Sequence, residues 1–251
     1  MSNKTRIQQL RLEQERAARE KRIRKVVMIS VVGVVAVALI GVVVWMVLGA
    51  NRQQPAASAA AASAAEIGAV HGDALVLGKD NAPVTLDVYQ DYMCPYCGQF
   101  ERANRADLQQ LVDNGTVRLV IHPLAFLDAQ SSGTRYSSRA SNAVVTVAQY
   151  QPDKLLAFNA ILYEQQPAEN SQGLSDDQIA ELARTAGVDD ATIKRFAADS
   201  NAGFVTSLTQ AAFDGGIKGT PTVKINGEVF NGNVYAAGPL KEAVLSAAKG
   251  S

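Results

Sequence analysis

The pattern of hydrophobic and polar positions divides the chain into three parts. Residues 26–50 form an apolar run without a charged side chain, and a stretch rich in Ala and Ser follows over 51–69. From 70 to 251, short apolar runs alternate with turn signals and with segments of helical periodicity. We therefore expect a linker over 51–69 and one globular α/β domain over 70–251.

The apolar run 26–50 is long enough to cross a membrane. In a helix its 25 residues, at about 1.5 Å each, exceed the roughly 30 Å hydrocarbon core of a bilayer. A cleavable signal peptide is the alternative, but its apolar region normally holds only about 7–15 residues. The pattern favours a single uncleaved transmembrane helix.

The distribution of charge predicts which side of the membrane each end of that helix faces. The chain has 24 basic and 24 acidic residues, but residues 1–25 carry nine basic and three acidic ones. Basic flanks stay in the cytoplasm, so the tail 1–25 should be cytoplasmic and the domain 70–251 extracytoplasmic. We expect a single-pass protein of the cell membrane. One short basic run gives no reason to expect nucleic acid binding.

Within the domain, the local patterns predict the order β-α-β, a helical block, and then β-β-α. Strands are indicated by alternation and β-branched residues, and helices by capping boxes, N-cap residues and glycine stops. The hairpin signal is Asn226-Gly227. The expected strands are 83–90, 116–122, 221–225 and 228–230. The expected helices are 97–111, several over about 125–215 with starts at Ser175, Asp189 or Asp190, and Asn201, and a last one from Pro239.

The chemistry is concentrated at Cys94 and Cys97, the only cysteines of the sequence. They follow a predicted strand and open a predicted helix, where free backbone N–H groups and the helix dipole stabilise an anion. The pKa of Cys94 should therefore fall and its thiolate should be reactive. Cys97, one turn into the helix, lies within disulfide reach. We expect Cys94 to be the exposed attacking thiol and Cys97 the buried resolving one.

Two other interpretations of the cysteine pair are weaker. Half a zinc site would need further ligands, and the only histidines are His71 and His122. A structural disulfide over so short a loop would remove little chain entropy. A redox-active pair is favoured, with no metal and no cofactor.

Two motifs together resemble a known family. Residues 82–101 (APVTLDVYQDYMCPYCGQFE) and the segment Gly219-Thr220-Pro221-Thr222 resemble the DsbA-like thiol–disulfide oxidoreductases of the thioredoxin superfamily. The layout is similar to membrane-anchored forms of Gram-positive bacteria, particularly actinobacteria. The resemblance implies a thioredoxin-like fold with a helical subdomain inserted at about 125–215, preceded by one transmembrane helix.

The same resemblance implies roles for individual residues. Cys94 would be the nucleophile and Cys97 its partner in a catalytic disulfide. Pro221 would be a cis-proline facing the pair, and the backbone of Thr220 would bind a substrate peptide as an added strand. A strand-entry proline is the alternative for Pro221. The residues that would form the substrate groove are Pro95, Tyr96, Thr220 and Pro221.

Three acids are candidates for tuning the thiols. Glu101 lies two helical turns after Cys94, where the family often has such an acid; a solvated helix acid is the alternative. Asp91 would cap the start of the helix. Family members often carry a buried acid six residues before the first cysteine, but that position is Val88. Its neighbour Asp87 should face the other side of the sheet unless a bulge turns it inward.

These features predict an extracytoplasmic thiol–disulfide oxidoreductase. Its substrates would be exported polypeptides with free thiols, and a DsbB-like or VKOR-like membrane partner would reoxidise it. A disulfide reductase or isomerase of the same fold is one alternative. A membrane-tethered binding or holdase module with secondary redox activity is another.

Overall fold

The computed structural model describes residues 68–198 and 201–250. The expected cytoplasmic tail 1–25, the transmembrane helix 26–50 and most of the linker 51–69 lie outside these residues. Among the described residues, no helix combines the length and the apolar composition needed to cross a membrane.

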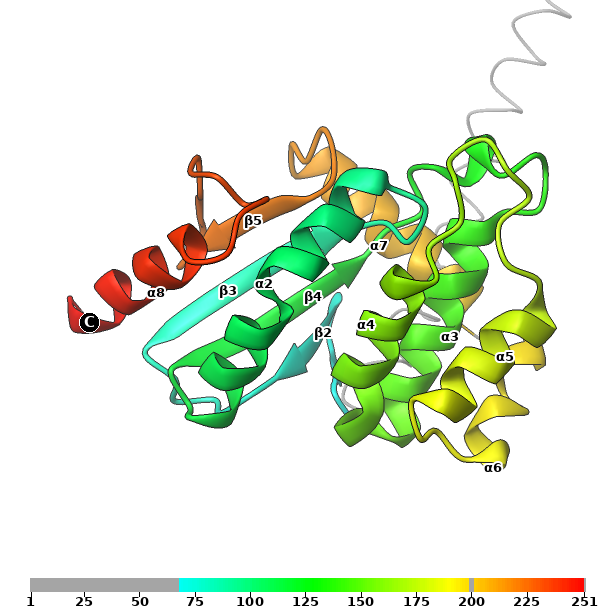
Figure 1. Ribbon diagram of the computed structural model, residues 1–251, viewed down its shortest axis with the longest axis horizontal. Coiled ribbons are helices and arrows are strands. Elements are labelled where there is room, and N and C mark those ends of the chain that lie inside the picture. The colour runs from blue at the N-terminus through cyan, green and yellow to red at the C-terminus, as the bar shows by residue number, and fades with distance from the viewer. Residues whose placement is uncertain (1–67, 199–200, 251) are drawn as a thin grey trace, which may run out of the picture. The chain divides into compact units, whose positions relative to one another are not determined.

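The described residues contain a six-stranded sheet with the strand order β1-β2-β4-β3-β5-β6. The central strands β3 and β4 pair in parallel, and the other neighbours pair antiparallel. The strands are β1 (Val70–His71), β2 (Ala74–Leu77), β3 (Val84–Gln90), β4 (Val117–Pro123), β5 (Thr222–Ile225) and β6 (Glu228–Val229). This mixed sheet carries the helices described next on its faces and edges (Figure 1).

The strands predicted from alternation are confirmed. In β3 every second side chain is buried, beginning with Val84, because this strand lies at the centre of the sheet with one face against helices. The hairpin of β5 and β6 turns at Asn226 and Gly227, whose positive φ angles of 50° and 86° suit these residue types. The strands β1 and β2 were not among those predicted. They hold two and four residues, too few to show a period.

The helices are α2 (Pro95–Asp113), α3 (Tyr136–Tyr150), α4 (Leu155–Glu164), α5 (Asp176–Thr185), α6 (Asp190–Ile193), α7 (Ala202–Asp214) and α8 (Pro239–Lys249), with 3-10 turns at Asp128–Gln130, Pro152–Lys154 and Phe196–Ala198. Thus α3 to α7 fill the chain between β4 and β5. The fold is thioredoxin-like α/β with this added helical content.

The predicted helix boundaries are mostly confirmed. The capping box at Ser175 and Gln178 is present, and Asp189 caps α6 by accepting from the Thr192 N–H at 2.7 Å. The run after Asp189 is shorter than expected, a four-residue helix followed by a 3-10 turn. The helix expected at 97–111 begins two residues earlier, with proline in its first turn, and ends two residues later.

Helix α2 is held from several sides. It packs against β4, α4 and α8 and lies in front of the sheet in Figure 1. Its apolar face buries Phe100, Leu108 and Leu111. The Asn104 amide donates to the Val234 carbonyl oxygen at 2.7 Å. Because these contacts fix the helix, they also fix its N-terminus at the end of β3.

Candidate active site

The two cysteines lie where β3 ends and α2 begins. Cys94 is the N-cap residue with extended backbone angles, and Pro95 is the first helical residue. The N–H groups of Cys97 and Gly98 donate to the Cys94 carbonyl oxygen at 3.0 and 3.3 Å. Both cysteines are free thiols. The short turn therefore presents the dithiol form at the helix N-terminus.

The pKa values of the two thiols are shifted in opposite directions. Cys94 is 5% exposed and Cys97 is fully buried. A hydrogen bond with the Cys97 thiol is the main cause that lowers the pKa of Cys94 to about 6; burial acts against it, and contacts to Thr220 and to the N–H groups of Cys97 and Tyr96 assist. Burial raises the pKa of Cys97 well above its usual value. Both thiols are buried, so the expectation that Cys94 is exposed is wrong, while Cys97 is buried as expected. Cys94 is still the less buried and the more acidic thiol of the pair.

The Thr220–Pro221 segment faces the cysteines from the start of β5. Its peptide bond is cis, and the Thr220 carbonyl oxygen lies 3.2 Å from Cys94 Sγ, where it accepts a hydrogen bond from the thiol. The structure thus brings together the two motifs, which lie 126 residues apart in the chain.

Asp91 is the buried acid beside the pair. Its backbone N–H donates to Cys97 Sγ at 3.5 Å. Its carboxylate accepts from Ser137 Oγ at 2.6 Å and from the N–H groups of Met93 and Leu127 at 2.8 and 2.9 Å. Burial raises its pKa to about 6 against these hydrogen bonds. The expectation that Asp91 caps α2 is wrong, because its side chain joins the active-site turn to the segment after β4 and to α3.

Asp87 is separated from the thiols by the sheet. Its neighbour Val88 is in the core, and β3 pairs with β4 and β5 in continuous register, so no bulge turns Asp87 inward. The Asp87 Oδ1 atom lies 3.1 Å from His122 Nε2. His122 is the penultimate residue of β4, where it stacks on Tyr89 with ring centroids 4.1 Å apart. Strand alternation correctly predicted the side on which Asp87 lies.

Glu101 is not a solvated helix acid. It is 6% exposed, and burial raises its pKa to about 7, with an opposing hydrogen bond from Asn159 of α4. In the described part of the chain, no contact joins its carboxyl group to either sulfur. The helical spacing alone did not reveal its burial, because α4, which covers it, comes from a distant part of the sequence.

Sequence reasoning missed Gln166, which follows α4. Its side-chain amide donates to the carbonyl oxygens of Tyr92 and Cys94 at 3.0 and 2.8 Å. A Cβ atom at Gly98 would overlap the Gln166 side chain, so glycine after Cys97 leaves room for this clamp. No local motif marks Gln166, since its partners lie more than 70 residues away.

A groove beside Cys94 has a volume of about 410 Å³. Apolar side chains from distant segments line it together with Lys218 and Glu169. Phe213 on its rim is 65% exposed and Tyr96 is 57% exposed. The ring of Tyr235 lies 5.9 Å from that of Tyr96. An apolar polypeptide segment could lie here within reach of the Cys94 thiol.

Known proteins share this arrangement. The family model described as Thioredoxin matches residues 71–241. The chain belongs to the thioredoxin family. This match covers β1 through the start of α8 and includes both cysteines and the cis-proline.

Individual relatives narrow the comparison within the thioredoxin family. The chain is 28% identical over 183 residues to disulfide bond formation protein D of Bacillus subtilis, which covers 70% of this chain and 77% of that protein. The solved structure of reduced DsbA from Mycobacterium tuberculosis superimposes with a TM-score of 0.58 at 25% identity, over 70% of this chain and 100% of that chain. The resemblance to DsbA-like thiol–disulfide oxidoreductases is therefore confirmed.

A third relative has a different overall organisation. A stretch of 172 residues is 33% identical to the serine/threonine-protein kinase PknE of Mycobacterium tuberculosis, over 64% of this chain. The match spans only 30% of the kinase. The shared stretch thus occurs as one part of a longer protein.

Proposed function

We propose that this protein is a thiol–disulfide oxidoreductase that introduces disulfides into exported polypeptides through Cys94 and Cys97. The observation that carries this proposal is the pKa of Cys94, lowered to about 6 beside a buried Cys97 whose pKa is raised. A stabilised thiolate favours the reduced dithiol form. A disulfide whose reduced form is stabilised is a strong oxidant.

The proposed exchange starts from the oxidised Cys94–Cys97 pair. A substrate thiolate attacks Cys94 Sγ, the Cys94–Cys97 bond breaks, and Cys97 leaves and takes up a proton. A second substrate thiolate attacks the substrate sulfur of the mixed disulfide and releases Cys94 as a thiolate. The substrate loses two electrons to form its disulfide, and the protein gains them as the dithiol. Because Cys94 is a good leaving group at its low pKa, the second step is favoured.

The surroundings assign roles to the other site residues. Pro95 starts the helix and lines the groove with Tyr96 and Thr220. Pro221 does not line this groove, and its part is the cis peptide bond with Thr220 beside Cys94. The backbone at Thr220 binds the substrate chain as an added strand. Of the three candidate acids, Asp91 is the one that contacts a cysteine, through its backbone N–H. We therefore assign the tuning of the thiols to Asp91 rather than to Asp87 or Glu101.

We also propose that residues 26–50 anchor the protein in the cell membrane as one helix, with residues 1–25 in the cytoplasm. The uncharged run and its basic N-terminal flank support this orientation. A membrane protein of the DsbB-like or VKOR-like type would then reoxidise the dithiol. In intact cells, an impermeant maleimide should label Cys94 in the reduced full chain. Labelling only after the membrane is opened would contradict the extracytoplasmic placement.

Oxidation of a reduced substrate tests the activity itself. The oxidised full chain should remove two thiols from an unfolded two-cysteine polypeptide for each protein molecule consumed. Cys94→Ala should abolish this transfer. Cys97→Ala, mixed with the oxidised form of the same polypeptide, should accumulate a mixed disulfide, because the Cys94 thiolate attacks the substrate disulfide, releases one substrate thiolate and has no Cys97 to resolve it. The matched Cys94→Ala variant should trap none. Faster reduction of an oxidised substrate than oxidation of a reduced one would instead support the reductase alternative.

A further inference from the structure

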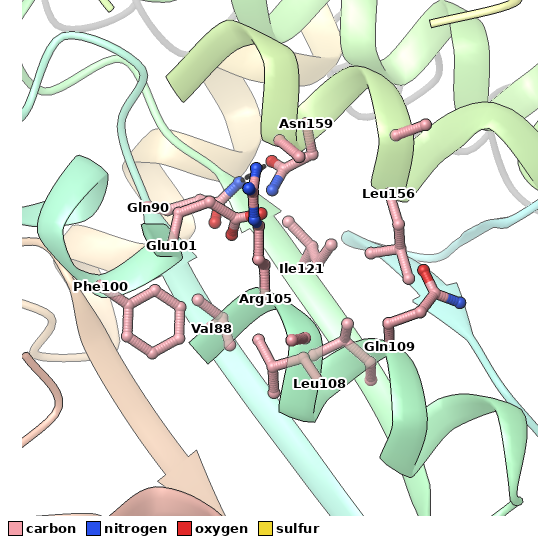
Figure 2. Close-up of a pocket in the computed structure, with 14 residues that line it drawn as sticks. Val88, Gln90, Phe100, Glu101, Arg105, Leu108, Gln109, Ile121, Leu156 and Asn159 are labelled. Atoms are coloured by element: carbon pink, nitrogen blue, oxygen red, sulfur yellow. Dashed lines mark hydrogen bonds between the residues drawn. The ribbon is translucent and has the colours of Figure 1, made fainter. Parts of the chain in front are cut away.

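A second cavity lies away from the cysteine groove, between α2 and α4 over the sheet (Figure 2). Its volume is about 280 Å³. The wall is mostly apolar, formed by Val88, Phe100, Leu108, Leu119, Ile121 and Leu156. Two of the lining residues are exposed, Ala106 of α2 and Ala157 of α4. We take them as the mouth of the cavity, which opens to solvent between these two small side chains. The cavity shares no lining residue with the groove beside Cys94.

One end of this cavity is polar. Figure 2 shows Gln90, Glu101 and Asn159 gathered there beside Arg105. Asn159 Oδ1 accepts from Gln90 Nε2 at 2.6 Å and from the Tyr92 hydroxyl at 2.8 Å, while the Asn159 amide hydrogen-bonds to Glu101. One amide does not fill the acceptor sites of a carboxylate. Glu101 thus presents unused acceptor capacity to the cavity.

The charge of this end is negative when Glu101 is ionised. Arg105 forms an ion pair with Glu164 at the surface, which leaves the Glu101 carboxylate as the net charge of the three groups. Burial raises the pKa of Glu101 to about 7, although the positive charge of Arg105 acts in the opposite direction. A buried carboxylate is stabilised by a cation that supplies hydrogen-bond donors.

We propose that the cavity binds a small amine with one positive charge and an apolar body, with its ammonium group on Glu101. The apolar wall would take the body of the ligand, and the ammonium donors would fill the remaining acceptor sites of the carboxylate. A cavity of about 150 Å³ accommodates benzene, so a phenylalkylamine matches this larger volume. The site does not depend on the redox function, because no cysteine lines it.

Calorimetric titration of the full chain with three ligands of equal size tests the proposal. 2-Phenylethylamine carries the ammonium group, propylbenzene replaces it with a methyl group, and benzyl methyl ether keeps a polar atom without a charge or a donor. At about pH 8, where Glu101 is ionised, the amine should bind at least about tenfold more tightly than either neutral ligand. Glu101→Gln should remove this preference, and the exposed Glu228→Gln control should keep it.

A second variant keeps the test independent of the buried carboxylate. Ala157→Leu places a larger side chain at the exposed mouth and should weaken amine binding by about tenfold or more. Three results would overturn the proposal: no amine binding at millimolar concentration, equal affinity for amine and propylbenzene, or unchanged amine binding by Glu101→Gln. Amine binding by Cys94→Ala equal to that of the unchanged chain would support a site separate from the redox centre. Its loss in that variant would contradict such a site.

Discussion

The acidity of Cys94 comes mainly from its nearest neighbours. The hydrogen bond with the Cys97 thiol contributes most, and the contacts to Thr220 and to two backbone N–H groups add to it, while burial opposes them. The sequence predicted a low pKa of Cys94 from its position at the helix N-terminus. The N–H groups at this position do lower the pKa, but they are not its largest cause. Cys97 is therefore the main influence on the pKa of Cys94, whereas the raised pKa of Cys97 comes first from burial and only then from Cys94.

Replacing Cys97 tests this dependence. Cys97→Ala removes the main hydrogen bond, so the pKa of Cys94 should rise from about 6 by roughly one unit or more. The pH dependence of iodoacetamide alkylation of Cys94, followed by mass spectrometry, gives this pKa. Cys97→Ser retains a hydrogen-bond donor and should show a smaller rise. An alkylation midpoint that is the same in Cys97→Ala and the unchanged chain would disprove the role assigned to Cys97.

At the scale of elements, the segment after α4 reaches over to the active-site turn. Gln166 binds the carbonyl oxygens of Tyr92 and Cys94, and Gly98 provides the space for its side chain. The carboxylate of Asp91 ties the same turn to α3 through Ser137. The helices between β4 and β5 thus hold the cysteine turn at two points.

Gln166→Ala removes one of these points. We expect the free energy of unfolding to fall by about 1–2 kcal/mol, because the Tyr92 carbonyl group loses its side-chain donor. The Cys94 carbonyl group loses one donor but keeps the N–H groups of Cys97 and Gly98. The pKa of Cys94 should rise as its backbone becomes less fixed against the N–H groups. Urea unfolding and alkylation rates measure the two effects. The adjacent and exposed Gln165 is the matched control, and an equal effect of Gln165→Ala on the Cys94 pKa would refute the clamp.

Local patterns predicted the elements that carry their own signals. The alternation of β3, the capping box at Ser175 and the Asn226-Gly227 hairpin all depend on near neighbours in the sequence. The two motifs of the site were found for the same reason. Contacts between distant segments could not be predicted from the sequence. The burial of Glu101 depends on α4. The hydrogen bonds of Gln166 depend on a turn that lies over 70 residues away in the chain. The short strands β1 and β2 offered too few residues for a pattern.

At the scale of the whole described domain, the buried acids make stability depend on pH. Burial raises the pKa of Glu101 to about 7 and that of Asp91 to about 6, both above their usual values. The folded state therefore binds more protons than the unfolded state between about pH 4 and pH 7. Stability falls as the pH rises through this window, because each ionised carboxylate is buried.

Glu101→Gln should remove the larger part of this dependence. We compare the free energy of unfolding of the variant with that of the unchanged chain at each pH. This difference should change in favour of the variant by roughly 3 kcal/mol between about pH 4 and pH 8. Urea unfolding of the reduced protein at several pH values measures the difference. Glu228→Gln, which changes an exposed carboxylate, should show no such trend. A difference between Glu101→Gln and the unchanged chain that is constant with pH would contradict the raised pKa.

The direction of electron flow is a property of the whole active site, and the reduction potential of the Cys94–Cys97 pair measures it most directly. Equilibration of the full chain with glutathione buffers of known ratio, followed by alkylation of free thiols, gives this potential. A dithiol stabilised as the Cys94 thiolate predicts a value well above the approximately −270 mV of thioredoxin, toward the approximately −120 mV of DsbA. A value near that of thioredoxin would contradict the assignment of this protein as an oxidant of exported thiols.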